Sequence, residues 1–344
     1  MGRLSLWCLG ALIHLAAPMR LGVPAAGARV VGSVISCPVV SCASVSLDTP
    51  APSPVPRLDE IRGLIRMARL NTVPMGASLV ALGAYGARHV RVMTTCGGAR
   101  LARLILGAVL TIIVTTGSML INDYHDFREG VDTAETKPGR PLVTGQVRPE
   151  TVKLVLKWAY ALHLTLLCLV DSALMRLWVL ANTLLTYLYS VHLKPITGVK
   201  NFVCATIVSM GLGLGAVAQA GSGLEPLRAV WRPMAAVGGL IWHREIVMDI
   251  GDMEGDALVG VRTLPVVLGA DKALLVSFIP LSLSIATAAS IGGPRALVAT
   301  APLVAQACFA LWTRKCSFTK SSLALPIEWA PYLLLVTLIT LTSA

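Results

Sequence analysis

Long apolar segments recur along most of this chain, and they restrict it to very few architectures. From Arg57 onward, stretches close to membrane-spanning length follow one another with short connections. A transmembrane helix needs about 20 predominantly apolar residues. We place such segments near residues 64–86, 101–121, 152–170, 173–192, 201–220, 231–248, 272–291, 295–312 and 325–343. The sequence therefore predicts an all-α polytopic membrane protein with nine transmembrane helices.

The composition argues against the main alternatives. Hydrophobic residues make up 55% of the chain and charged residues 14%, whereas soluble domains carry about 25% charged residues. This balance excludes an ordinary soluble domain and a disordered chain. No apolar run alternates with period two over many segments, which argues against a β-barrel. The eight cysteines are scattered singly, a pattern typical of apolar core positions rather than of disulfides or a zinc site.

The net charge of +11 indicates membrane topology rather than a nucleic-acid partner. With nine spans, the loops after the second, fourth, sixth and eighth spans share one side with the N-terminus. Most Lys and Arg residues fall on that side, which therefore faces the stroma, matrix or cytosol. The two acid-rich segments, 122–135 and 249–256, fall on the same side.

The N-terminal region has the composition of a targeting peptide. Residues 1–47 contain no acidic residue, and the apolar run 4–17 has the length of a signal-peptide core. A Ser- and Val-rich, transit-like stretch follows, so we expect a two-step route into a plastid. A secretory signal and a mitochondrial presequence remain alternatives. Residues 48–56 form a Pro-rich linker, which leaves residues 57–344 as the transmembrane domain.

The first acidic cluster lies at the exit of the second predicted span. Asp126 follows Asn122 by four residues and Asp123 by three, and this spacing places the three side chains on one helix face. The cluster continues with Glu129 and Asp132.

The second cluster lies at the exit of the sixth predicted span, where Asp249, Asp252 and Asp256 again share one helix face. Carboxylates at a membrane boundary are costly and need partners. Mg²⁺ prefers oxygen ligands and is commonly shared with substrate phosphates. Either cluster alone is compatible with a solvated acidic loop, but two at matched helix ends indicate a two-metal site for a diphosphate.

Three cations lie close to these clusters in the sequence. Arg140 follows the first cluster, Lys194 follows the fourth span, and Arg244 precedes Asp249 by five residues. Cations and metals stabilise the charge that develops on a departing diphosphate. We therefore predict these three residues as diphosphate ligands, although each is also compatible with a topology-setting positive charge.

At these residues the chain resembles the UbiA superfamily of intramembrane prenyltransferases, over about residues 57–344. Together the motifs are highly specific, whereas none of them is so alone. They are N-D-x-x-D at 122–126, R-P-L at 140–142, Y-S-V-H-L-K at 189–194, D-x-x-D-x-x-G-D at 249–256 and R-T-L-P at 262–265.

The resemblance implies nine helices around a central cavity, Mg²⁺ as cofactor and a prenyl diphosphate as donor. The catalytic residues would be Asp123, Asp126, Asp252 and Asp256, and the metal ligands would be these four with Asn122 and Asp249. The donor would lose diphosphate, and the acceptor would attack the resulting allylic cation. Tyr189 and Asn71 would position substrate, although Asn71 is equally compatible with helix packing.

The two acidic motifs resemble enzymes that use different acceptors. The spacing after Asp126 leaves Glu129 or Asp132 as the third acid of the first motif, and it resembles enzymes that prenylate dihydroxynaphthoate. The second motif resembles enzymes acting on geranylgeranylglyceryl phosphate, homogentisate or chlorophyllide. We expect an aromatic lipoquinone precursor of the naphthoate, homogentisate or hydroxybenzoate type. Geranylgeranylglyceryl phosphate and chlorophyllide remain the alternatives.

An ion-coupled transporter is the competing class of function. Transporters commonly hold their acidic residues near the bilayer midplane, in broken helices. Here both clusters lie at helix ends, which favours the transferase.

Overall fold

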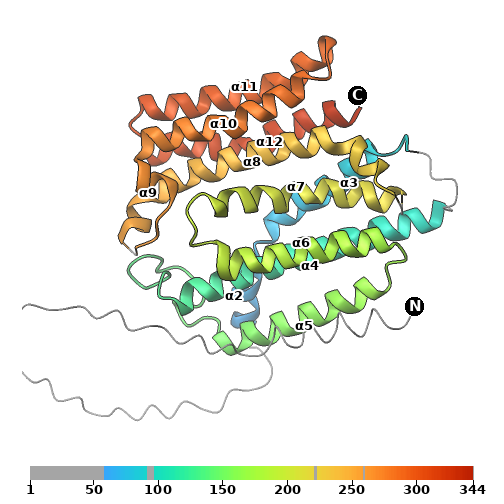
Figure 1. The fold of residues 1–344 in the computed structure, drawn as a ribbon. Coiled ribbons are helices and arrows are strands. Elements are labelled where there is room, and N and C mark those ends of the chain that lie inside the picture. Colours follow the sequence, from blue (N-terminus) through green and yellow to red (C-terminus); the bar gives the residue numbers. More distant parts are fainter. Residues whose placement is uncertain (1–57, 91–96, 221–222, 259, 344) are drawn as a thin grey trace, which may run out of the picture. The chain divides into compact units, whose positions relative to one another are not determined.

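The structure is a computed structural model that describes residues 58–90, 97–220, 223–258 and 260–343. Over these residues the chain is helical and contains no strand (Figure 1). The targeting peptide and linker predicted for residues 1–56 lie outside the described part. The elements are α2 (Leu58–Ala68), the 3₁₀ turn η1 (Leu70–Thr72), α3 (Val73–Gly86), α4 (Gly97–Arg128), α5 (Pro149–Cys168), α6 (Ala173–Leu188), the π-helical turn η2 (Tyr189–Leu193), α7 (Val199–Ala220), α8 (Glu225–Leu258), α9 (Leu264–Leu268), α10 (Ala270–Ala289), α11 (Gly293–Lys315) and α12 (Lys320–Ser343).

Each predicted span overlaps a helix, but the count of nine transmembrane helices is not confirmed. Within the described residues, six helices are long and apolar enough to cross a bilayer, namely α4, α5, α7, α10, α11 and α12. Of the other three, α3 and α6 have 14 and 16 residues. Helix α8 has 34 residues and carries many charges along its length.

The first predicted span, 64–86, is wrong at its start. The chain forms the amphipathic helix α2, breaks at Arg69 and starts α3 at Val73. Arg69 has a left-handed backbone with φ of 47°, which a continuous right-handed helix does not allow. Only the part from Val73 onward therefore belongs to an apolar helix.

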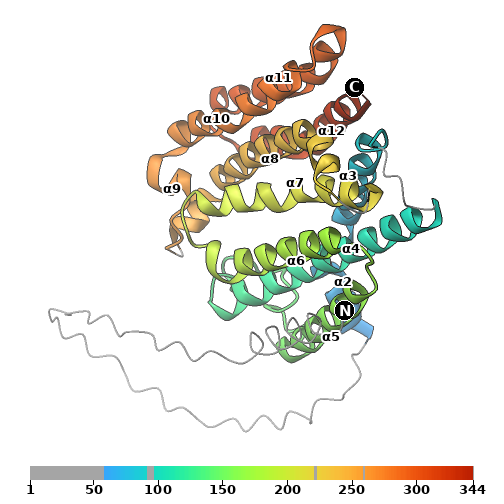
Figure 2. The same cartoon turned by 45° about the vertical axis from the view of Figure 1, so that its right-hand side comes forward.

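Helix α8 is the centre of the bundle, because it packs on α7, α10 and α12. Helix α7 also packs on α3, α4 and α6. Helix α11 packs on α10 and α12 (Figures 1 and 2). Helices α4 and α8 both run toward the end of the bundle that holds α9. The acidic clusters at their carboxyl ends are thereby placed at one end of the molecule.

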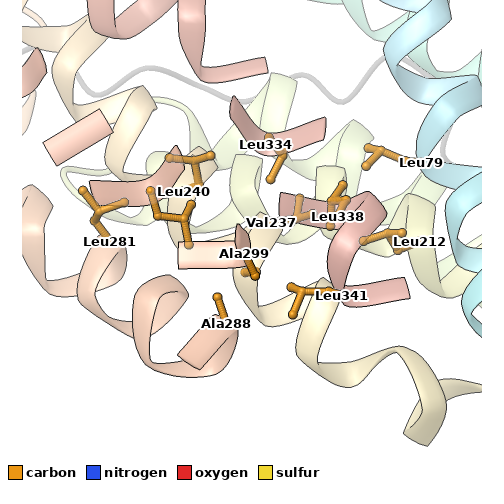
Figure 3. Close-up of a cluster of buried hydrophobic side chains, with 12 residues drawn as sticks. Leu79, Leu212, Val237, Leu240, Leu281, Ala288, Ala299, Leu334, Leu338 and Leu341 are labelled. Atoms are coloured by element: carbon orange, nitrogen blue, oxygen red, sulfur yellow. The ribbon is translucent and has the colours of Figure 1, made fainter. Parts of the chain in front are cut away.

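The core is a layer of aliphatic side chains from α3, α7, α8, α10, α11 and α12. Figure 3 shows its members. Three of them, Leu79, Leu212 and Leu240, are each at most 3% exposed. Glycines let α3 and α7 approach closely: a Cβ on Gly83 would strike the Leu212 backbone, and one on Gly215 would strike the Val80 backbone. Small residues commonly allow such contact between helices in membranes.

Candidate active site

The first acidic cluster is built on the last two turns of α4. The helix continues to Arg128, so Asn122, Asp123 and Asp126 do share one face, as their spacing predicts. Asp123 is only 3% exposed. Its two carboxylate oxygens accept hydrogen bonds from Arg140 Nη1 at 2.8 and 2.9 Å. A charged hydrogen bond to both oxygens fixes the position of the arginine.

Arg69 is the second cation at Asp123. Its Nη2 donates to Asp123 Oδ1 at 3.1 Å, and its left-handed backbone terminates α2. Such strained conformations persist where the surrounding structure holds them, often at functional sites. Asn71, two residues further along the chain, is exposed in η1. The structure therefore brings Arg69 to the cluster, whereas Asn71 stays a prediction.

The structure distinguishes the two candidates for the third acid. Asp132 is buried, with its Oδ2 atom 3.6 Å from Arg140 Nε. Burial raises the pKa of Asp132, and the nearby Arg140 charge opposes that rise. Glu129 has a side chain that is 65% exposed and lies beside His125. Asp132 is thus part of the cluster, and Glu129 faces away from it.

Lys194 pairs with the remaining aspartate of α4. Its Nζ lies 2.6 Å from Asp126 Oδ2, and Asn122 Nδ2 donates to the same oxygen at 3.4 Å. Lys194 directly follows η2, the π-helical turn that starts at Tyr189. Turns of this kind often occur at functional sites, and this one directs Lys194 toward α4.

The second acidic cluster occupies the end of α8. Asp249 is 7% exposed. Its Oδ1 lies 2.7 Å from Lys200 Nζ, and its Oδ2 accepts a hydrogen bond from Asn201 Nδ2 at 2.8 Å. Asp252 is exposed, and Asp256 is partly buried close to Thr263. Burial raises the pKa of Asp256.

One short segment joins the two clusters. Lys194, at the end of η2, pairs with Asp126 of α4, while Lys200, at the start of α7, pairs with Asp249 of α8. Tyr189, at the start of η2, belongs to the same segment. The two motifs, more than a hundred residues apart in the sequence, therefore form one site.

The oxygens available at this site are suited to a hard cation. Across the described residues, no three His, Cys, Asp or Glu side chains are arranged as a metal site, and Arg or Lys side chains contact Asp123, Asp126 and Asp249. Two buried oxygens nevertheless accept no hydrogen bond there, Asn201 Oδ1 and Asp256 Oδ2. Mg²⁺ prefers oxygen ligands of this kind. The metal ligands proposed from the sequence stay predictions, with Asn201 as an addition.

Arg244 takes a different place from the one expected. Its Nε donates to the Ile327 carbonyl of α12 at 3.1 Å, and its Nη1 donates to Glu245 at 3.0 Å. The structure shows no contact between Arg244 and Asp249 in the described part. Its role as a diphosphate ligand stays a prediction.

Sequence reasoning gave no site role to Lys200 or Glu245. A signal for Glu245 existed, because it precedes Asp249 by four residues and that spacing places both on one helix face.

An apolar groove with a volume of about 260 Å³ lies between α7, α8 and α10. Its α8 residues include Ala235, Gly238 and Trp242, which continue at helical spacing to Glu245 and Asp249. The groove and the acids thus follow the same stripe of α8.

Residues 76–327 match the UbiA prenyltransferase family. Two curated relatives are both named digeranylgeranylglyceryl phosphate synthase. The protein from Methanopyrus kandleri is 32% identical over 219 residues, which cover 63% of this chain and 73% of the relative. The protein from Halobacterium salinarum is 34% identical over 226 residues, covering 63% and 72%.

Solved structures share the fold. A digeranylgeranylglyceryl phosphate synthase superposes with a TM-score of 0.62 at 20% identity, over 83% of this chain and 98% of that one. A UbiA homologue from Archaeoglobus fulgidus bound to DMAPP and Mg²⁺ gives a TM-score of 0.59 at 16% identity, over 82% and 99%.

Proposed function

We propose, from the premise that the chain belongs to the UbiA prenyltransferase family, that it transfers a geranylgeranyl group from its diphosphate to the free hydroxyl of geranylgeranylglyceryl phosphate. The observation that carries this proposal is the single site formed by the two acidic helix ends and the cations between them. The named activity of the curated relatives supports the choice of acceptor.

This choice replaces the aromatic acceptor expected from the first motif. The relatives that span most of the domain are named for a glyceryl phosphate substrate. Nothing among them supports a naphthoate, homogentisate or hydroxybenzoate acceptor. Of the two candidates that the first motif offered for its third acid, we include Asp132 in the proposed site, because it lies beside Arg140.

The proposed roles follow from the geometry. Arg69, Arg140 and Lys194 would donate to the diphosphate oxygens from positions fixed by Asp123 and Asp126. This placement of cations favours the charge that develops as the carbon–oxygen bond breaks.

Magnesium fits the second cluster. Asn201, Asp249, Asp252 and Asp256 offer the oxygens that would hold it. When bound, Mg²⁺ would neutralise diphosphate charge and so make the diphosphate a better leaving group. Mg²⁺ bound with DMAPP in the Archaeoglobus fulgidus homologue supports this assignment.

The proposed enzyme works within a membrane, since six helices are apolar and long enough to cross one. Its relatives reported above come from archaea, so they do not support the plastid or mitochondrial location expected from residues 1–47. No feature of the site supports an ion-coupled transporter.

The test is an acceptor panel with the purified full chain in detergent, Mg²⁺ and labelled geranylgeranyl diphosphate. The panel contains geranylgeranylglyceryl phosphate, dihydroxynaphthoate, homogentisate, 4-hydroxybenzoate and chlorophyllide. We expect an ether product with geranylgeranylglyceryl phosphate that Asp252→Ala abolishes. An aromatic product instead would overturn the acceptor, and the absence of diphosphate release with every acceptor would overturn the reaction.

A further inference from the structure

Glu245 is an acidic side chain at the site that the proposed reaction has not yet used. It lies one helical turn before Asp249 on α8, which is about 6 Å along the helix axis. Because α8 ends at the acidic end of the bundle, Glu245 lies deeper in the apolar part than the predicted metal ligands. Its side chain keeps 20% of its surface exposed.

The contacts of Glu245 hold it in place from two sides. Arg244 Nη1 donates to Glu245 Oε1 at 3.0 Å, and Arg244 is itself fixed by the Ile327 carbonyl of α12. The Cys204 side chain of α7 lies close to the same carboxylate group. A carboxylate at this depth is costly and is expected to have a function.

The surroundings of Glu245 match the place where the reacting carbon would lie. Glu245 lies four residues before Asp249 and three after Trp242, which lines the apolar groove, so the three residues follow one stripe of α8. A diphosphate held at Asp249 would have its first prenyl carbon on the apolar side, toward the next turn of α8. That turn carries Glu245.

Transfer to an alcohol produces a proton, and the site needs a group to accept it. The cations at the first cluster are donors and cannot do so. Both carboxylate oxygens of Asp123, Asp126 and Asp249 already take part in hydrogen bonds or ion pairs. Arg244, by contrast, occupies one oxygen of Glu245, Oε1.

We propose that Glu245 accepts the proton of the acceptor hydroxyl during prenyl transfer, an inference that rests on the alcohol acceptor of the proposed function. The hydroxyl oxygen forms a bond to the first prenyl carbon, and the bond from that carbon to the diphosphate oxygen breaks. Diphosphate leaves with the bonding electron pair. The hydroxyl proton moves to the Glu245 carboxylate and passes from there to water.

The experiment compares two rates in the full chain with Mg²⁺ and labelled geranylgeranyl diphosphate. One is ether formation with geranylgeranylglyceryl phosphate, and the other is diphosphate release without any acceptor. Glu245→Gln keeps the size of the side chain and one accepting oxygen but removes its basicity. Glu254→Gln is the matched control, because Glu254 is exposed on the opposite face of α8.

We expect Glu245→Gln to slow ether formation about 100-fold, a typical loss for a general base. Diphosphate release without acceptor should stay within about twofold of wild type, since donor ionisation needs no base. Glu245→Ala should regain ether formation with added formate, which a purely structural role would not allow. Glu254→Gln should behave as wild type.

The outcomes separate this inference from the proposed function. Equal loss of both rates in Glu245→Gln, with no rescue by formate, would make Glu245 a structural residue. Unchanged ether formation would also overturn its role. A wild-type chain that forms no ether with this alcohol would overturn the proposed function, and the role of Glu245 with it.

Discussion

The two acidic clusters have similar spacing in the sequence but different partners in the structure. At the end of α4, Asp123, Asp126 and Asp132 each lie beside an arginine or lysine. At the end of α8, Asp249 has such a partner. Asp252 makes no ion pair within the described residues, and one oxygen of Asp256 accepts no hydrogen bond there.

This difference indicates a division of labour. The acids of the α4 cluster lie beside cations of the chain itself, and we propose that they hold Arg69, Arg140 and Lys194 in place for an anion. The α8 cluster keeps surplus negative charge and free oxygen atoms, which suit a hard divalent cation. Two similar acidic motifs can therefore differ in function: one positions cationic side chains, and the other offers negatively charged oxygens to a metal ion.

The largest expected effect is the loss of prenyl transfer when an aspartate of either cluster is replaced by alanine. Asp252→Ala and Asp123→Ala should each lower prenyl transfer by at least about 100-fold, because each removes charge stabilisation at the leaving group. Only Asp123→Ala should also destabilise the fold, by about 2 to 4 kcal/mol, since it removes the buried partner of Arg69 and leaves Arg140 with Asp132 alone. Transfer assays and thermal unfolding in detergent measure the two effects.

The control for this pair is Asp271→Ala, which removes an exposed acid paired with Arg314 on the surface. It should leave both activity and stability close to wild type. Equal loss of stability in Asp252→Ala and Asp123→Ala would contradict the division between the clusters.

A second test concerns the magnesium requirement. Asp256→Asn should raise the Mg²⁺ concentration for half-maximal activity by at least about tenfold, because it removes a charged oxygen ligand. Asp132→Asn should leave that concentration nearly unchanged, since Asp132 lies beside Arg140. The measurement is activity against free Mg²⁺ in a chelator buffer. The reverse order of sensitivity would place the metal at the α4 cluster.

The sequence predicts most of the helices and both motifs because their signals are local. Apolar length marks the spans, and spacings of three and four residues place Asp249, Asp252 and Asp256 on one face. The pairs Arg140–Asp123 and Lys194–Asp126 agree with the expectation that cations lie near the clusters.

What the sequence does not predict depends on tertiary contacts. The break at Arg69 is a backbone conformation held by a partner 54 residues away. The break cannot be recognised from the length of the apolar stretch, because α2 also contains hydrophobic residues. Arg244 and Glu245 are adjacent in the sequence, yet only the packing of α7 and α12 shows which one faces the site.

A third test compares the basic side chains that pair with the two clusters, Arg140 at α4 and Lys200 at α8. Arg140→Lys should raise the KM for the prenyl diphosphate about tenfold, because a lysine cannot reproduce the contacts of Arg140 with Asp123 and Asp132. Lys200→Arg should change KM only about twofold, since Lys200 makes a single-atom contact with Asp249. Steady-state kinetics with varied donor decide this. Equal changes in KM would show that geometry at Arg140 is unimportant.

The smallest expected effect concerns the support of the α4 cluster by α2. Glu60 accepts hydrogen bonds from the Arg148 backbone N, its Nε and Nη2, and from Thr151 Oγ1, at 2.6 to 3.1 Å. The Arg148 hydrogen bonds are the main cause of the lowering of the Glu60 pKa from 4.5 to about 2. A carboxyl group with a lowered pKa stabilises the fold above its ordinary pKa, and this contribution is lost as the pH falls toward the lowered value.

Glu60→Gln should therefore lower the thermal unfolding midpoint by a few degrees at pH 7. The gap to wild type should shrink as the pH falls from about 4.5 toward 2. Asp59→Asn is the matched control, because Asp59 is the neighbouring acid and its side chain is 80% exposed. A gap that stays constant from pH 7 to pH 3 would show that α2 is held by its apolar face alone, and the α4 cluster would then not depend on this ion pair.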